Sequence, residues 1–191
     1  MKSAFLGRTP FAWLACLLLA VTATAHAAAP APDRSTAGYE IDFMEDMIDH
    51  HFMAVQTATL CEQRAVHEAL RSMCSNIKAT QTQEIATMQS WLQSWYSDAY
   101  QPEMNQSGMR MMEKLAALSG AEFEISFMEM MIKHHAKAIK EATTCLERAY
   151  HPELLNLCQG IIETQTAEIR QMRAWLCEWY GICKAQKESA S

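Results

Sequence analysis

Apolar side chains recur at helical spacing through most of this chain. Phe43, Met47 and Ala54 follow one another at intervals of three, four or seven residues, and no glycine or proline interrupts residues 39–101. A second apolar row with the same spacing runs from Ile77 to Trp95. The pattern predicts two long amphipathic helices in the first half of the chain.

The same pattern returns in the second half. Residues 40–96 align with residues 124–180 without a gap, and about half of the aligned positions are identical. The identical positions include cysteines, histidines and tryptophans, which are too rare for chance to align. Such self-similarity marks an internal duplication, so each half is expected to form the same pair of helices.

Each repeat is predicted to be a helical hairpin. Pro152 suits the first turn of a helix, which places the bend of the second hairpin at residues 148–150. Each hairpin alone exposes an apolar face, and the two faces are best buried against each other. The sequence therefore predicts an all-α fold: an antiparallel four-helix bundle of two duplicated hairpins with a pseudo-twofold axis.

The chain divides into six segments on this reading. They are a signal peptide (1–27), a flexible leader (28–36), the first hairpin repeat (37–97), a linker with a short helix (98–119), the second hairpin repeat (120–183) and a C-terminal tail (184–191). The linker contains Pro102, and its short helix is predicted from Met109 to Leu118.

The first 27 residues have the features of a cleavable export signal. Lys2 and Arg8 form a short basic segment, Phe11 to Val21 is an apolar run, and Ala25-His26-Ala27 is a small-x-small cleavage pattern. The apolar run is about half the roughly 20 residues that span a bilayer. We therefore expect a periplasmic or secreted protein whose mature chain has no membrane span.

The cysteines fit an oxidising compartment. Cleavage removes Cys16 and leaves six of the seven cysteines, an even number that indicates disulfides in an exported chain. Their spacing predicts three local bridges, each worth about 2–4 kcal/mol: Cys61–Cys74, Cys145–Cys158 and Cys177–Cys183. Thiolate metal ligands are the alternative interpretation.

The charge argues against nucleic acid as a partner. The chain has 16 basic and 22 acidic residues, and loss of Lys2 and Arg8 with the signal brings the net charge to about −8. An acidic chain of this kind repels phosphate backbones and permits attraction of cations.

A pair of adjacent histidines lies in the apolar stripe of the first helix of each repeat. At about 100° per residue, His51 projects with Met44 and Met47 into the middle of the stripe, whereas His50 lies at its edge. Glu84 shares the buried face of the second helix. His67 and His151, by contrast, lie near the hairpin bends and are interpreted as capping or surface residues.

Two interpretations of these buried polar groups are open, since buried carboxylates and imidazoles need partners. One is a structural His51–Glu84 hydrogen bond in each repeat, with methionines as flexible core filler. The other is a metal site: imidazole and thioether ligands together suit copper, particularly Cu(I), and disfavour calcium or magnesium. Four of the 14 methionines lie around the linker, and they could form a second, looser copper-capture patch or simply serve as helix filler: Met104, Met109, Met111 and Met112.

The candidate metal ligands come in matching sets from the two repeats. They are Met44, Met47, His50, His51, Glu84 and Met88, and Met128, Met131, His134, His135, Glu168 and Met172. No Glu-x-x-His di-iron motif, haem-attachment motif, zinc-protease motif or nucleophile elbow is present, so we do not expect an enzyme.

The repeated motifs resemble a known family. Phe-Met-x-x-Met-Ile-x-His-His-x-x-Ala, followed by Gln-x-x-Glu-Ile-x-x-Met-x-x-Trp-Leu, is similar to the bacterial domain-of-unknown-function family 305 over nearly the whole mature chain. The resemblance implies an exported, ferritin-like helical protein, with periplasmic copper binding through methionine and histidine in some members. Asp49 and Lys133 stand where the family usually has proline before His-His.

The sequence therefore predicts a non-enzymatic copper-binding protein. It would sequester or transfer copper, chiefly Cu(I), with Cu(II) as an option at the outer His50 and His134. A periplasmic copper chaperone or exporter is a candidate partner. The alternative function is a metal-free helical scaffold or partner-binding module whose His–Glu pairs are internal polar contacts.

Overall fold

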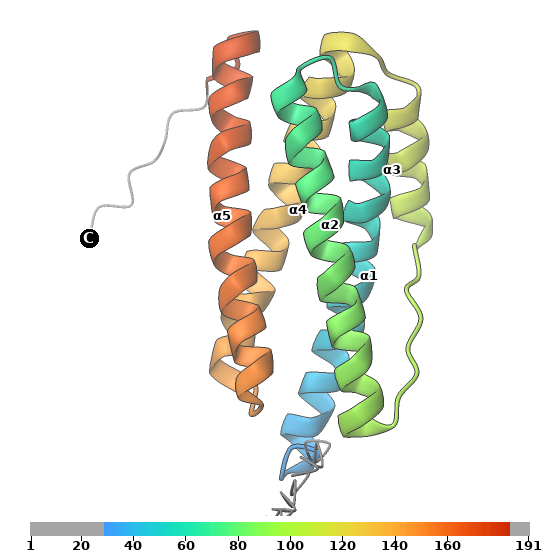
Figure 1. The fold of residues 1–191 in the computed structure, drawn as a ribbon, viewed down its shortest axis with the longest axis vertical. Coiled ribbons are helices and arrows are strands. Elements are labelled where there is room, and N and C mark those ends of the chain that lie inside the picture. The colour runs from blue at the N-terminus through green and yellow to red at the C-terminus, as the bar shows by residue number, and fades with distance from the viewer. Residues whose placement is uncertain (1–28, 184–191) are drawn as a thin grey trace, which may run out of the picture.

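Four long helices form two antiparallel hairpins in the computed structural model, which describes residues 29–183 (Figure 1). The long helices are α1 (Arg34–Arg64), α2 (Glu68–Trp91), α4 (Gly120–Arg148) and α5 (Pro152–Tyr180). The shorter α3 (Gln106–Ala116) lies between the hairpins, and α2 continues into the π-helical turn η1 (Leu92–Tyr96). The described residues contain no strand. The predicted all-α bundle of two hairpins is confirmed, while the predicted signal peptide lies outside the described residues.

The connection between the hairpins runs the length of the bundle. Because α2 and α4 run in the same direction, the chain must return from the end of η1 to the start of α4 (Figure 1). The returning segment includes α3, which contacts both α1 and α4. The two hairpins meet closely along α1 and α4, whereas α2 and α5 approach each other less closely.

Side-chain caps determine where two of the helices begin. Asp33 accepts a hydrogen bond from the Thr36 N–H at 2.8 Å, so α1 begins at Arg34. The expectation of a flexible leader over residues 28–36 is therefore wrong for residues 34–36, which are helical. Asn105 caps α3 in the same way, and that helix covers residues 106–116 rather than the predicted 109–118.

Three disulfides join neighbouring parts of the chain. Cys61–Cys74 and Cys145–Cys158 each link the end of one helix to the beginning of the next across a hairpin bend, and Cys177–Cys183 ties the last turn of α5 to the segment after it. All three predicted bridges are confirmed.

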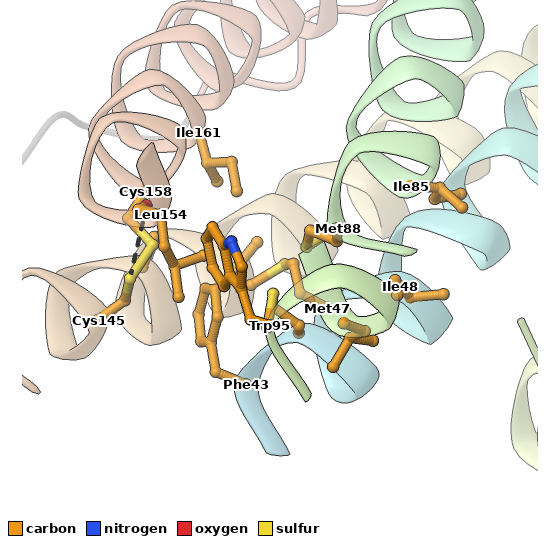
Figure 2. Packing of buried hydrophobic residues seen from close by; sticks show 14 residues of the cluster. Phe43, Met47, Ile48, Ile85, Met88, Trp95, Cys145, Leu154, Cys158 and Ile161 are labelled. Atoms are coloured by element: carbon orange, nitrogen blue, oxygen red, sulfur yellow. Dashed lines mark hydrogen bonds between the residues drawn. A yellow bond between two sulfur atoms is a disulfide. The ribbon is translucent and has the colours of Figure 1, made fainter. Parts of the chain in front are cut away.

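The core consists of two clusters related by the duplication. In the first, Phe43, Met47 and Met88 from the first hairpin pack against Leu154 and the Cys145–Cys158 disulfide of the second (Figure 2). The second cluster packs methionines of the second hairpin against the disulfide end of the first. Each hairpin thus buries its apolar stripe on the other, at opposite ends of the bundle.

Buried carboxylates also join the hairpins. Glu40 of α1 is 0 % exposed and accepts hydrogen bonds from the backbone N–H groups of Tyr150 (2.7 Å) and His151 (2.9 Å), from Nδ1 of His151 (2.6 Å) and from the Tyr96 hydroxyl. Trp95 stacks on the His151 ring with centroids 3.8 Å apart. The N-terminus of α5 is therefore capped by a carboxylate from the other hairpin.

Glu124 repeats this arrangement in the other direction. It accepts hydrogen bonds from the backbone N–H groups of Val66 and His67, from Nδ1 of His67 and from the Tyr180 hydroxyl. His67 and His151 occupy the N-cap positions of α2 and α5, but neither side chain caps its own helix. The interpretation of His151 as a simple capping or surface residue is wrong, because its ring is buried against Glu40 and Trp95.

Candidate metal centre

The outer histidines of the two repeats meet where α1 and α4 cross. The rings of His50 and His134 are stacked, with centroids 3.6 Å apart and planes inclined by 23°. Nε2 of His50 and both ring nitrogens of His134 are buried and have no hydrogen-bond partner. Buried imidazole nitrogens are normally satisfied, so three unpartnered nitrogens at one point indicate a place for a ligand.

Both of these rings are held neutral at physiological pH. Burial is the main cause: it lowers the pKa of His50 to about 3, helped by the neighbouring His51 and Lys137. Burial likewise holds the pKa of His134 well below its usual 6.5, and the adjacent His50 adds to the effect. Neutral imidazole is the form that binds metal ions.

A pocket of about 640 Å³ opens beside this histidine pair, between α1, α4 and the segment that carries α3. Its lining combines the two imidazoles with four thioethers: His50, His134, Met53, Met104, Met111 and Met130. The charged groups around it are four carboxylates and two ammonium groups: Asp46, Asp49, Glu103, Glu129, Lys133 and Lys137. The excess of carboxylates favours cations over anions.

The linker is held against the pocket by Asp49. One carboxylate oxygen accepts a hydrogen bond from the Tyr100 hydroxyl at 2.9 Å, and the other accepts one from the Glu103 N–H at 2.7 Å. Met104 follows directly. Its side chain lies so close to Gly108 that a Cβ there would be 2.8 Å from Met104 Cγ, so a larger residue at this buried position would displace the Met104 side chain.

The inner histidines point away from this pocket and contact the second helices. Nε2 of His51 forms a hydrogen bond of 2.7 Å with Glu84. Nε2 of His135 lies 2.8 Å from a Glu168 oxygen, but the pair is not aligned as a hydrogen bond. Both His51 and His135 are fully buried, as the helical wheel predicts.

The six methionines predicted as ligands lie in the two core clusters. Met44, Met47 and Met88 belong to the first cluster, and their counterparts in the second repeat belong to the second. All six are fully buried, and none lines the pocket. Of the 12 candidate ligands, the structure therefore brings only His50 and His134 to the pocket, where it adds Met104 and Met111 from the linker cluster.

Sequence reasoning missed Met53 and Met130 because it searched for residues shared by both repeats. Met53 aligns with Lys137, and Met130 aligns with Asp46, so neither thioether is repeated. The signal that could have found them is helical spacing, since Met53 lies three residues after His50 and Met130 four residues before His134. Of the aligned pairs that line the pocket, His50 and His134 alone are identical.

Two features are absent from the described part of the chain. Within residues 29–183, no group of three or more His, Cys, Asp or Glu side chains is arranged to hold a metal ion. The donors that distinguish the pocket are instead thioether sulfurs. Over the same residues, no helix combines the length and apolarity needed to cross a membrane.

Solved structures similar to this chain include metal-bound proteins. CopM in its Cu(I)-bound form is 32% identical, with a TM-score of 0.67, and the match covers 74% of this chain and 98% of CopM. CopM in its Cu(II)-bound form matches with a TM-score of 0.68 and 32% identity, over 74% of this chain and 97% of that one. No curated protein matches the chain.

A further similar structure is a DUF305 protein from Streptomyces coelicolor. It is 26% identical, has a TM-score of 0.68, and is matched over 78% of this chain and 97% of its own. The family model described as "Domain of unknown function (DUF305)" matches residues 40–176, which include most of both hairpins and the whole pocket. The chain therefore belongs to the DUF305 family.

Proposed function

We propose that this chain is an exported copper-binding protein that takes up Cu(I) in the pocket between α1, α3 and α4. The observation that carries the proposal is the meeting of two neutral imidazoles, each with at least one buried and unpartnered ring nitrogen, with four thioethers in one pocket. Thioether and imidazole are soft to borderline donors, a combination that suits Cu(I) and is poorly suited to Ca²⁺ or Mg²⁺.

The pocket is accessible to an incoming ion. His50, Met53, Met104 and Met130 are half-buried, and Met111 is 36% exposed at the rim. Methionine side chains are flexible enough to turn towards a bound ion without a change in the backbone. These features suit a site that both takes up and releases its cargo, in keeping with sequestration or transfer.

The similar structures support copper as the cargo. CopM has been crystallised in Cu(I)-bound, Cu(II)-bound and silver-bound forms, and it shares 32% identity with this chain. Silver(I) has the same charge and softness as Cu(I). In this chain we assign the soft ions to the thioethers and imidazoles together, and we assign Cu(II) to the pair of imidazoles with a nearby carboxylate.

The inner pairs have a different role in this proposal. His51 and Glu84 already satisfy each other in part, which matches the alternative interpretation of internal polar contacts. We assign His51, Glu84 and their counterparts His135 and Glu168 to positioning, since they hold α1 against α2 and α4 against α5. The core methionines act as packing groups within the two core clusters.

Competitive titration of the purified, disulfide-intact protein with Cu(I) tests the proposal. We expect at least one bound Cu(I) per chain, and a loss of affinity of about 10-fold or more in the double variant His50→Gln, His134→Gln. The same substitutions at His51 and His135 provide the comparison and should change affinity less. Stoichiometry below one, or no effect of the outer pair, would overturn the proposal.

The thioethers are tested by a matched pair on α3. Met111 lines the pocket, whereas Met109 is on the same helix, is 47% exposed and does not line it. Met111→Leu should weaken binding of Ag(I), used here as a redox-inert probe, and Met109→Leu should leave it unchanged. Equal effects of the two substitutions would contradict a specific thioether site.

Export supports this function without requiring a particular partner. The sequence begins with the features of a signal peptide, and the structure has three disulfides of the kind formed outside the cytoplasm. We propose a periplasmic or secreted location, where a copper chaperone or exporter would be the exchange partner. Fractionation of expressing cells, with mass determination of the mature N-terminus, tests the location.

A further inference from the structure

A second cavity lies on the opposite side of the bundle, between α2 and α5. It has a volume of about 10 Å³, which is about one water-sized sphere and therefore room for a single water or monatomic ion. Its lining is fully symmetric: Ile77, Thr80, Gln81 and Glu84 from α2, with Ile161, Thr164, Gln165 and Glu168 from α5. Each lining residue thus has its identical counterpart from the other repeat in the same lining, whereas the lining of the proposed copper pocket is asymmetric.

The glutamines of this cavity lack partners. Gln81 and Gln165 are each 3% exposed, and the Oε1 atom of each is buried without a hydrogen bond. A buried amide oxygen left unsatisfied is destabilising, and two of them at one cavity indicate that something supplies the missing contact.

The glutamates supply negative charge to the same cavity. Glu84 and Glu168 are 16% and 14% exposed, and no lysine or arginine lines the cavity with them. Each carboxylate has its Oε2 atom next to the Nε2 atom of a buried histidine. The histidines thus fix the orientation of the carboxylates from behind, as the outer partners of metal ligands commonly do.

We propose that this cavity, at the seam between α2 and α5, is a binding site for one hard divalent cation of the calcium type. Two glutamates and two glutamines with unpartnered amide oxygens line it, together with two threonines, and one divalent ion would balance the two carboxylate charges. Calcium accepts six to eight oxygen ligands in flexible geometry, whereas magnesium keeps several of its waters, for which a cavity of one water's volume has no room.

A cation at this seam would join the two hairpins where they touch least. The close contact between the hairpins runs along α1 and α4, and α2 and α5 approach each other less closely. An ion bound by one carboxylate from each of these helices would therefore act as a cross-link in the folded state only. Binding of this kind raises the melting temperature in proportion to the logarithm of the free ion concentration.

The test uses copper-free, disulfide-intact protein, so that its outcome is independent of the copper proposal. We expect Ca²⁺ added after EDTA treatment to raise the melting temperature by about 3–10 °C at concentrations well above the dissociation constant. Calorimetry should give one Ca²⁺ per chain, and Mg²⁺ at the same concentration should give a smaller shift.

Two sets of variants locate the effect. Glu84→Gln with Glu168→Gln should abolish the calcium-dependent shift, whereas Glu147→Gln with Glu178→Gln, which removes the same charge from exposed positions, should retain it. Gln81→Leu with Gln165→Leu keeps the carboxylates and should weaken the shift. Absence of any calcium effect on the wild type would show that ordered water alone fills the cavity, and a shift that persists without Glu84 and Glu168 would show that calcium binds elsewhere; either result would overturn the proposal.

Discussion

The contact between Glu40 and the start of α5 offers the sharpest test of how the two hairpins are held together. Replacement of Glu40 by alanine removes the acceptor for four donors: two backbone N–H groups, the His151 ring and the Tyr96 hydroxyl. None of the four is relieved by water at the carboxylate, because Glu40 is 0 % exposed and the side chain of His151 is only 4% exposed.

The magnitude follows from these contacts. A hydrogen bond to a charged group contributes about 1.5–3 kcal/mol, and the contributions within one cluster are not additive. Removal of one member of a buried, hydrogen-bonded pair costs about 3–5 kcal/mol, and we expect that loss in the free energy of unfolding for Glu40→Ala. The corresponding Glu124→Ala should cost less, because its partner His67 is 39% exposed.

Urea unfolding of the disulfide-intact protein measures these losses. Circular dichroism follows the helices, and tryptophan fluorescence follows the four tryptophans of the described residues, among them Trp95, which stacks on His151. Coincident transitions would justify a two-state treatment. Glu147→Ala, at an exposed position, is the matched control and should change stability by no more than about 0.5 kcal/mol. A loss below about 1 kcal/mol for Glu40→Ala would refute the account of a buried cross-hairpin cap.

Three further predictions follow from the same contacts. Burial alone would raise the pKa of Glu40, but the hydrogen bonds that its carboxylate accepts, led by that of the Tyr96 hydroxyl, outweigh burial and hold the pKa below 4.5. Folding stability should therefore fall as the pH drops below about 4.5. Glu40→Gln should make this pH dependence shallower in urea titrations at several pH values. Gly108→Ala should raise the helix propensity of α3 and with it the melting temperature. It should nevertheless weaken Ag(I) binding by about 10-fold, because the new Cβ displaces the Met104 side chain, so that affinity falls while the melting temperature rises. Asp49→Ala should weaken Ag(I) binding by releasing the linker, whereas Asp49→Asn, which keeps an acceptor for the Glu103 N–H, should weaken it less in the same titration.

Much of the architecture could be predicted because it depends on local, repeated patterns. The spacing of apolar residues predicted the helices, the position of Pro152 predicted one hairpin bend, and the cysteine intervals predicted all three disulfides. The helical wheel also separated His51 from His50 correctly, since burial in a two-layer bundle follows the angular position on each helix.

The pocket could not be predicted in the same way. It depends on how the returning linker lies across α1 and α4, and that path is set by tertiary contacts such as those of Asp49. The cross-hairpin role of Glu40 was accessible but overlooked: it lies seven residues before Met47, in the middle of the apolar stripe, where a carboxylate requires a partner. The partner, His151, is on the other hairpin and leaves no sign in the local sequence.

The most direct test of the copper site is the position of the ion itself. Crystals of the Cu(I)-loaded protein, measured on both sides of the copper absorption edge, would locate it by anomalous scattering. The account predicts a peak in the pocket beside His50 and His134, within bonding distance of at least one pocket methionine. A peak between His51 and Glu84, or among the core methionines around Met47, with none in the pocket, would contradict it.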